Sequence, residues 1–199
     1  MADIVVIVAA VFLGFMAIGV PLPALPVFIH DQLGCGGLLV GWVIATQSIA
    51  TLVTRPLAAR LSDDRSPRVA AIAGLGGCAA AATLYLFASL LSTKPAASLA
   101  VLFAGRSALG LGESLLITGA LAWGIGLAGP GRAGKVMAWV GIAMYGALAV
   151  GAPLGGALLW SGGFLPVAVA AASFPLAGIA VSGMASPVAG AVQPPVSFL

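Results

Sequence analysis

Charged residues are what this sequence has least of. Only 7% of its 199 residues are Asp, Glu, Lys or Arg, whereas 61% are hydrophobic. A typical water-soluble domain has roughly 25% charged residues, because its surface has to be hydrated. The mean hydropathy of +1.18 therefore excludes a soluble globule and indicates a protein surrounded by lipid. Its eight basic residues are also too sparse for a nucleic-acid-binding surface, so no nucleic acid partner is expected.

Residues that carry enzymatic or metal chemistry are scarce as well. Cys35 and Cys78 are isolated from each other and from any metal-binding motif, so we expect neither a disulfide framework nor a metal. The only histidine, His30, lies at the end of a different predicted helix from Ser114, which makes a Ser–His–carboxylate site improbable. No P-loop is present, which excludes ATP-driven transport by this chain. We predict no enzymatic activity and no cofactor.

Long apolar segments are what the sequence does have. The hydrocarbon core of a bilayer is about 30 Å thick and requires ~20 apolar residues per helix. Six segments meet this requirement: Ile4–Ile29, Leu38–Leu57, Val69–Leu91, Ala97–Trp123, Val136–Leu159 and Phe164–Met184. The sequence therefore predicts an all-α membrane protein, with a six-helix transmembrane bundle over residues 1–184. Residues 185–199 are uncharged and aperiodic, which predicts a flexible tail.

Three prolines interrupt the first of these segments. Pro21, Pro23 and Pro26 fall within six residues of one another near its end. Proline lacks a backbone N–H and crowds the preceding turn. We therefore expect the first helix to be kinked or unwound there.

The few basic residues are distributed unequally between the two sides of the predicted bundle. One set of connecting loops contains Arg60, Arg65, Arg68, Arg132 and Lys135, whereas the other contains Lys94 alone. Loops rich in Lys and Arg remain on the cytoplasmic side of a membrane. We therefore expect both termini to lie in the cytoplasm, and the protein to be a multi-pass protein of the cell (inner) membrane.

Two charges lie inside an apolar segment, in the stretch "GRSALGLGESLL". Arg106, Gly110 and Glu113 follow the spacing i, i+4, i+7, so they share one helix face. A charge at the centre of a membrane helix costs about 2.5–3.5 kcal/mol on insertion scales, so this face is expected to meet a cavity or a polar partner. The two charges are roughly 10 Å apart along the helix axis, which is too far for an easy ion pair.

These two residues are candidates for transport chemistry. Arg106 is a candidate anchor for an anionic substrate group, or a group that sets the environment of a nearby carboxyl. Glu113 is a candidate proton carrier, since desolvation favours the neutral form of a carboxyl group. The alternative for Glu113 is a structural acid that pairs with a base of a loop. Gln47, with polar neighbours in the second predicted helix, either lines a pathway or forms interhelical hydrogen bonds.

Several motifs resemble those of the major facilitator superfamily. The loop "ARLSDDRSPR" is similar to the superfamily's signature between helices 2 and 3, with Leu61, Asp63 and Arg68 at matching positions. The resemblance implies that these three residues act in gating. The stretch "RSALGLGES" matches the superfamily's R-x-x-x-G-x-G pattern. The chain looks especially like poorly characterised bacterial members that resemble sugar- and drug-efflux proteins.

The fifth predicted helix ends in "GALAVGAPLGG", which resembles an element often found in the superfamily's antiporters. Its matching residues, which would act in helix packing, are Gly151, Pro153, Gly155 and Gly156. The resemblance implies proton-coupled export of a small molecule, with the lipid bilayer, the substrate and protons as partners.

The resemblance also implies that half of the fold is absent. Superfamily members have twelve helices in two six-helix halves, and this chain corresponds to the N-terminal half without the C-terminal one. We expect a truncated or fragmentary transporter. Two alternatives stay open: a homodimeric half-transporter, in which a second copy supplies the missing wall, and a structural or regulatory six-helix membrane protein without transport of its own.

Overall fold

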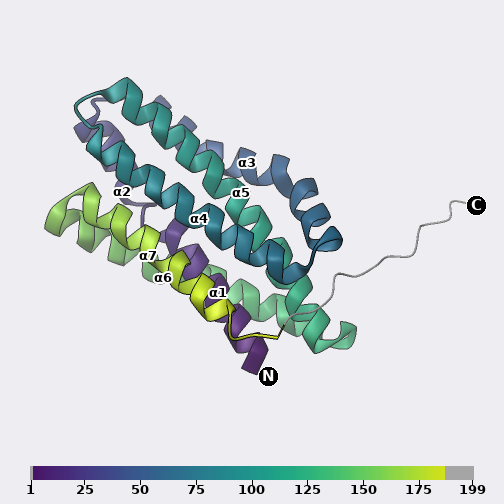
Figure 1. The fold of residues 1–199 in the computed structure, drawn as a ribbon. Helices are drawn as coiled ribbons and strands as arrows, with labels where there is room; N and C mark the ends of the chain where they lie inside the picture. The colour runs from purple at the N-terminus through teal and green to yellow at the C-terminus, as the bar shows by residue number, and fades with distance from the viewer. Residues whose placement is uncertain (1, 187–199) are drawn as a thin grey trace, which may run out of the picture.

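The fold is a bundle of long helices in a computed structural model, which describes residues 2–186 (Figure 1). Every regular element of these residues is helical. The elements are α1 (Ala2–Gly19), α2 (Ala24–Val27), the π-helix η1 (Phe28–Gln32), α3 (Gly37–Asp64), α4 (Pro67–Leu90), α5 (Pro95–Ala128), the 3-10 helix η2 (Pro130–Arg132), α6 (Ala133–Gly162) and α7 (Phe164–Ser182). Six spans are long and apolar enough to cross a membrane. The predicted all-α, six-span architecture is confirmed.

The prolines of the first span interrupt its helix, as the sequence predicts. Helix α1 ends at Gly19, and the chain becomes helical again only at Ala24 in α2. The N–H of Ala24 donates to the carbonyl of Pro21 at 3.0 Å, which closes the intervening turn. The short π-helix η1 then carries the span to Gln32. The interruption follows from the missing proline N–H groups, which cannot continue the helical ladder.

The loop between the second and third spans is shorter in the structure than the sequence predicts. Residues 59–68 were expected to be a loop, yet α3 continues to Asp64 and α4 begins at Pro67. Hydropathy locates only the apolar part of a helix, and the polar residues beyond it extend the same backbone ladder. The helix break is set by local chemistry instead: the Ser66 side chain accepts a hydrogen bond from the N–H of Val69 at 3.2 Å, and Pro67 occupies the first helical position.

The six long helices form two layers. One layer is the row α3, α5, α1 and α6, in which each helix contacts the next. The second layer is the pair α4 and α7, which contact each other and cover α5 and α1, respectively (Figure 1). Helices α3 and α6 therefore lie at the two ends of the longer row, with large apolar side chains such as Trp42, Leu52 and Ile142 exposed.

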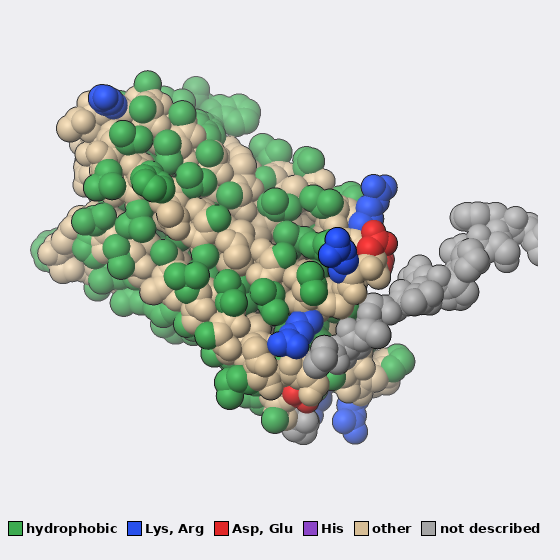
Figure 2. All heavy atoms as spheres, viewed as in Figure 1, with side chains coloured by type: hydrophobic (Ala, Val, Ile, Leu, Met, Phe, Trp, Pro, Cys, Tyr) green, Lys and Arg blue, Asp and Glu red, His purple; other side chains and the backbone are tan. Residues whose placement is uncertain are grey.

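Charged side chains gather at the ends of the bundle and leave an apolar band between them (Figure 2). We call the end formed by the α3–α4 turn, η2 and the start of α1 the basic end. It carries the five loop cations named above. Lys94, between α4 and α5, lies at the opposite end. The chain stays packed at the basic end through Ala185, which is buried; from residue 187 onward the predicted tail lies outside the described residues.

Candidate functional site

Glu113 lies near the middle of α5 and is hydrogen-bonded to α3. Its carboxylate oxygen Oε2 accepts a hydrogen bond from Gln47 Nε2 at 2.7 Å and another from Thr51 Oγ1 at 3.0 Å. Gln47 and Thr51 are four residues apart, so they extend from the same face of α3. Glu113 is half-buried. Two donors therefore fix the position of its carboxylate, while part of the residue remains exposed.

The Thr51 hydroxyl has a choice of hydrogen-bond partner. Its oxygen lies 3.0 Å from Glu113 Oε2 and 2.9 Å from the backbone carbonyl of Gln47, one helical turn earlier. A hydroxyl has a single proton to donate but also accepts hydrogen bonds. It donates to Glu113 when that group is a carboxylate. It accepts from Glu113 when that group is a carboxylic acid, and its own proton then turns to the carbonyl of Gln47.

Arg106 lies two turns before Glu113 and is also directed at α3. Its side chain is only 2% exposed, and its Nη2 donates to the carbonyl of Ile44 at 3.2 Å. Within the described residues its Nε and Nη1 atoms have no hydrogen-bond partner, and neither has the hydroxyl of the buried Tyr85 on α4. Arg106 is therefore enclosed between helices.

Gly110 lets α3 approach closely enough for these bonds to form. A Cβ atom at this position would collide with the carbonyl oxygen of Gln47, and it would come within 2.8 Å of the Thr51 nitrogen. The contacts of Arg106, Gly110 and Glu113 follow the order of Ile44, Gln47 and Thr51 along α3. The two helices thus run parallel in constant register, and the stripe recognised in the sequence faces α3 along its whole length.

The residues of the predicted gating motif lie at the basic end, away from Glu113. Asp63 is exposed in the last turn of α3, and Leu61 is half-buried. Arg68, in the first turn of α4, places Nη2 3.4 Å from the carbonyls of Ser182 and Gly183. Its guanidinium carbon also lies 5.8 Å from the centroid of the Trp123 ring. Of the three, Arg68 is the one that joins different helices, where a cation is favourable beside the C-terminal carbonyls of α7.

The antiporter-like element of α6 divides into packing and exposed residues. A Cβ atom on Gly155 would collide with the carbonyl oxygen of Val20, and one on Gly151 would come within 2.9 Å of the carbonyl carbon of Gly19. These two glycines therefore permit backbone contact between α6 and the end of α1. Pro153 is exposed, and Gly156 has open space around its α-carbon.

The sequence model of the Major Facilitator Superfamily matches residues 7–195, which is nearly the whole chain. The chain belongs to the Major Facilitator Superfamily. Residues 2–186 contain six helices of membrane-spanning length and composition, so the chain is a multi-pass membrane protein.

Relatives within the superfamily are substantially longer than this chain. It is 46% identical over 156 residues to uncharacterized MFS-type transporters of Burkholderia mallei (strain SAVP1) and Burkholderia pseudomallei (strain K96243). It is also 46% identical over 147 residues to an uncharacterized MFS-type transporter of Salmonella typhimurium (strain LT2). These alignments cover 74–78% of this chain but only 38% of each relative.

Thr51 is the residue of this site that sequence reasoning missed. Threonine is common in membrane helices, where its hydroxyl usually bonds to a carbonyl of its own helix, as Thr54 does to Ala50 at 2.7 Å. The available signal was its spacing of four residues from Gln47. That spacing becomes informative only once Glu113 is known to lie opposite Thr51. Thr51 lies outside the superfamily motifs, so the motifs do not identify it either.

Proposed function

We propose that this chain forms one wall of a secondary transport pathway for a small molecule, and that Glu113 carries the coupled proton. The observation behind the proposal is the pairing of Glu113 with Thr51 and Gln47. A half-buried carboxyl group in the middle of a membrane-spanning helix has partners that suit both of its protonation states. Ionisable residues inside membrane spans are typical of proton relays and substrate pathways.

Proton binding would change the bond that joins α3 to α5. The carboxylate accepts two hydrogen bonds from α3, and hydrogen bonds to an ionised group are roughly twice as strong as neutral ones. Protonation replaces them with neutral bonds and so weakens this contact. Helix α3 has most of its remaining surface exposed, which leaves it free to shift relative to α5. We infer that this helix pair transmits proton binding to the transport pathway.

The structure around Arg106 favours a role in setting the environment of the Glu113 carboxyl group over a role in binding substrate. With 2% exposure, its guanidinium is not accessible to a substrate in this conformation. It binds the Ile44 carbonyl, which holds α3 in the register that Glu113 requires. We propose that Arg106 is a positioning residue for Glu113.

The proposed direction of transport is export in exchange for protons, based on the resemblance of "GALAVGAPLGG" to the antiporter element. We further propose that the basic end faces the cytoplasm, because Lys and Arg are retained on that side. The membrane is then the cell (inner) membrane, with both termini inside. A complete pathway also needs a facing wall, supplied by further helices of a longer chain or by a second copy.

The proton step is tested by infrared titration of the reconstituted protein. We expect a carboxylic-acid C=O band that disappears in Glu113→Gln and persists in Asp31→Asn, which alters an exposed acid of η1. A band unchanged in Glu113→Gln would contradict Glu113 as the proton carrier.

The transport step is tested separately in proteoliposomes that contain a pH-sensitive dye, with a panel of small cationic and neutral molecules added outside. If a second copy supplies the missing wall, we expect proton movement with one class of molecule, and its loss in Glu113→Gln but not in Asp31→Asn. Proton movement absent for every molecule would contradict the homodimeric half-transporter, and would favour either further helices of a longer chain or the structural or regulatory alternative.

A further inference from the structure

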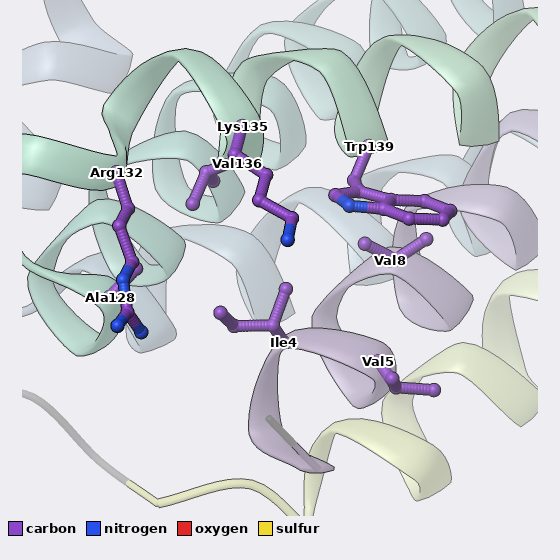
Figure 3. A pocket seen from close by; sticks show the side chains of 8 residues that line it. All are labelled: Ile4, Val5, Val8, Ala128, Arg132, Lys135, Val136 and Trp139. Atoms are coloured by element: carbon purple, nitrogen blue, oxygen red, sulfur yellow. The ribbon is translucent and has the colours of Figure 1, made fainter.

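Helices α1 and α6 contact each other closely at one end and separate at the other. Near the end of α1, Gly19 and Val20 lie against the backbone of Gly151 and Gly155. Toward the basic end the two helices enclose a cavity of about 610 Å³ (Figure 3). This volume falls within the roughly 300–1,000 Å³ of small-molecule sites. We call this cavity the α1–α6 wedge.

The interior of the wedge is apolar. Ile4 and Val8 of α1 face Val136 and Trp139 of α6 across it (Figure 3). Val136 is 2% exposed and forms the floor, whereas Trp139 is 46% exposed at the rim. An apolar space that opens at the surface of a membrane protein is solvated by hydrocarbon, because water gains no hydrogen bonds there.

Two cations lie at the mouth of the wedge. Arg132 belongs to η2 and Lys135 to the first turn of α6, and both side chains are exposed. Figure 3 shows the Lys135 side chain extending toward Ile4, and the Arg132 side chain extending beside Ala128. Helix α1 contains one acid, Asp3, whose Oδ1 accepts a hydrogen bond from the N–H of Ser186 at 3.1 Å. The residues that line the wedge are thus either apolar or positively charged.

The N-terminus of α6 adds to this positive field. The 30-residue helix begins at Ala133, between the two cations, and its first N–H groups and its dipole favour an anion there. The combination is amphipathic: an apolar slot with a cationic patch at one end, and with the Trp139 ring over Val8 on the side away from Arg132 (Figure 3). Tryptophan is enriched at the membrane–water interface, where its ring meets both lipid and headgroups.

We propose that the α1–α6 wedge binds one anionic phospholipid from the leaflet at the basic end. An acyl chain occupies the slot between Ile4, Val8 and Val136, and the phosphate is bound by Arg132 and Lys135. A neutral lipid would contact only the apolar residues of the wedge, and a soluble anion would contact only Arg132 and Lys135. The wedge does not involve Glu113, Gln47 or Thr51, so this site is independent of the proposed proton step.

The proposal is tested by native mass spectrometry of the full chain released from mild detergent, after titration with phosphatidylglycerol or with phosphatidylcholine of the same acyl chains. We expect one phosphatidylglycerol to be retained in preference to phosphatidylcholine. Arg132→Gln with Lys135→Gln should lower the affinity about tenfold or more, given the contribution of each cation near an anionic headgroup. Val8→Trp should block binding by filling the slot while both cations remain.

The matched control is Arg60→Gln with Arg65→Gln, which removes the same charge from the same end of the bundle, outside the wedge. Phosphatidylglycerol binding should be unchanged in it. An equal loss in this control, or equal retention of both lipids, overturns the proposal. Two further outcomes would also overturn the proposal. Competition by inorganic phosphate at the same concentration as the lipid would show that the cations bind free phosphate. A dimer that binds no lipid would show that a second copy fills the wedge. Thermal unfolding of each variant separates lost binding from lost folding.

Discussion

The two faces of α5 are packed in contrasting ways. Toward α4, the backbones touch: a Cβ on Gly112 would lie 2.7 Å from the Cys78 nitrogen and 2.8 Å from the Gly74 oxygen. Toward α3, only Gly110 permits such an approach, and polar side chains make the remaining contacts. The first face depends on shape and on a neutral hydrogen bond from Ser98 Oγ to the Ala88 carbonyl at 2.8 Å, whereas the second depends on shape and on the charge of Glu113.

This difference has a functional meaning in lipid. Association of membrane helices has no hydrophobic driving force, so it relies on close packing and on hydrogen bonds. Backbone packing is insensitive to protonation, which makes α4 and α5 a fixed pair. The contact with α3 contains an ionisable group, and on our proposal it is the contact that responds to protons. The following changes test this contrast, beginning with the largest expected effect.

Gly112→Leu should disrupt the α4–α5 contact. The new side chain meets backbone atoms of α4 that no rotamer change can move, so the destabilisation should be about 3 kcal/mol or more. Thermal unfolding in detergent measures it. Gly76→Leu is the control, since a Cβ at Gly76 has open space around it; equal loss in both variants would mean that close packing against α4 is not the cause.

Gly110→Val should separate α3 from α5 at a smaller cost, about 1–3 kcal/mol. The valine collides with the Gln47 carbonyl, but α3 lies at the end of its row and can move outward. Hydrogen exchange of α3 and α5 should increase more than that of α4. If protection of α4 fell as much as that of α3, the two contacts would not be independent.

Glu113→Leu and Glu113→Gln should differ in stability although both remove the charge. Leucine leaves Gln47 Nε2 without its partner, while the Thr51 hydroxyl turns to the Gln47 carbonyl, for a loss of about 1–2 kcal/mol. Glutamine keeps an acceptor oxygen for them, so its loss should be less than half as large. Unfolding measured at one pH compares the pair, and equal stability of the two variants would contradict a structural contribution of these bonds.

Thr51→Val should have the smallest effect, about 0.5–1 kcal/mol, the usual range for one interhelical hydrogen bond in a membrane protein. Thr54→Val is the matched control, because the Thr54 hydroxyl bonds only to carbonyls of its own helix. A double-mutant cycle of Thr51→Val with Glu113→Leu, which removes the acceptor, measures the coupling energy. A cycle with Thr54→Val in place of Thr51→Val should give none, and coupling of equal size in both would remove Thr51 from the site.

Much of the fold was predictable from the sequence because each span is a local property. The apolar segments identified all six spans, and the prolines at 21, 23 and 26 identified the interruption after α1. The helix boundaries were less predictable. Helix α3 extends to Asp64 because backbone hydrogen bonding continues past the apolar residues. The helical backbone is interrupted only just before Pro67, which begins α4, and Ser66 caps that helix.

The site was predictable in part. The spacing of Arg106, Gly110 and Glu113 placed them on one face, and that face indeed contacts another helix. Gln47 had two open interpretations, and in the structure it forms an interhelical hydrogen bond. Thr51 was not predictable, since its role depends on a residue 62 positions away.

What the sequence by itself determined is the membrane environment, the number of spans and the one-sided stripe of α5. These follow from composition and from the helical repeat, which act within one segment. What only the tertiary structure decided is that α3 covers the stripe, that Arg106 is enclosed while Glu113 stays half-exposed, and that α1 and α6 diverge into a wedge. These depend on the register between distant helices, because in lipid the pairing of helices is set by backbone fit across the whole bundle and not by the apolar pattern of any one helix.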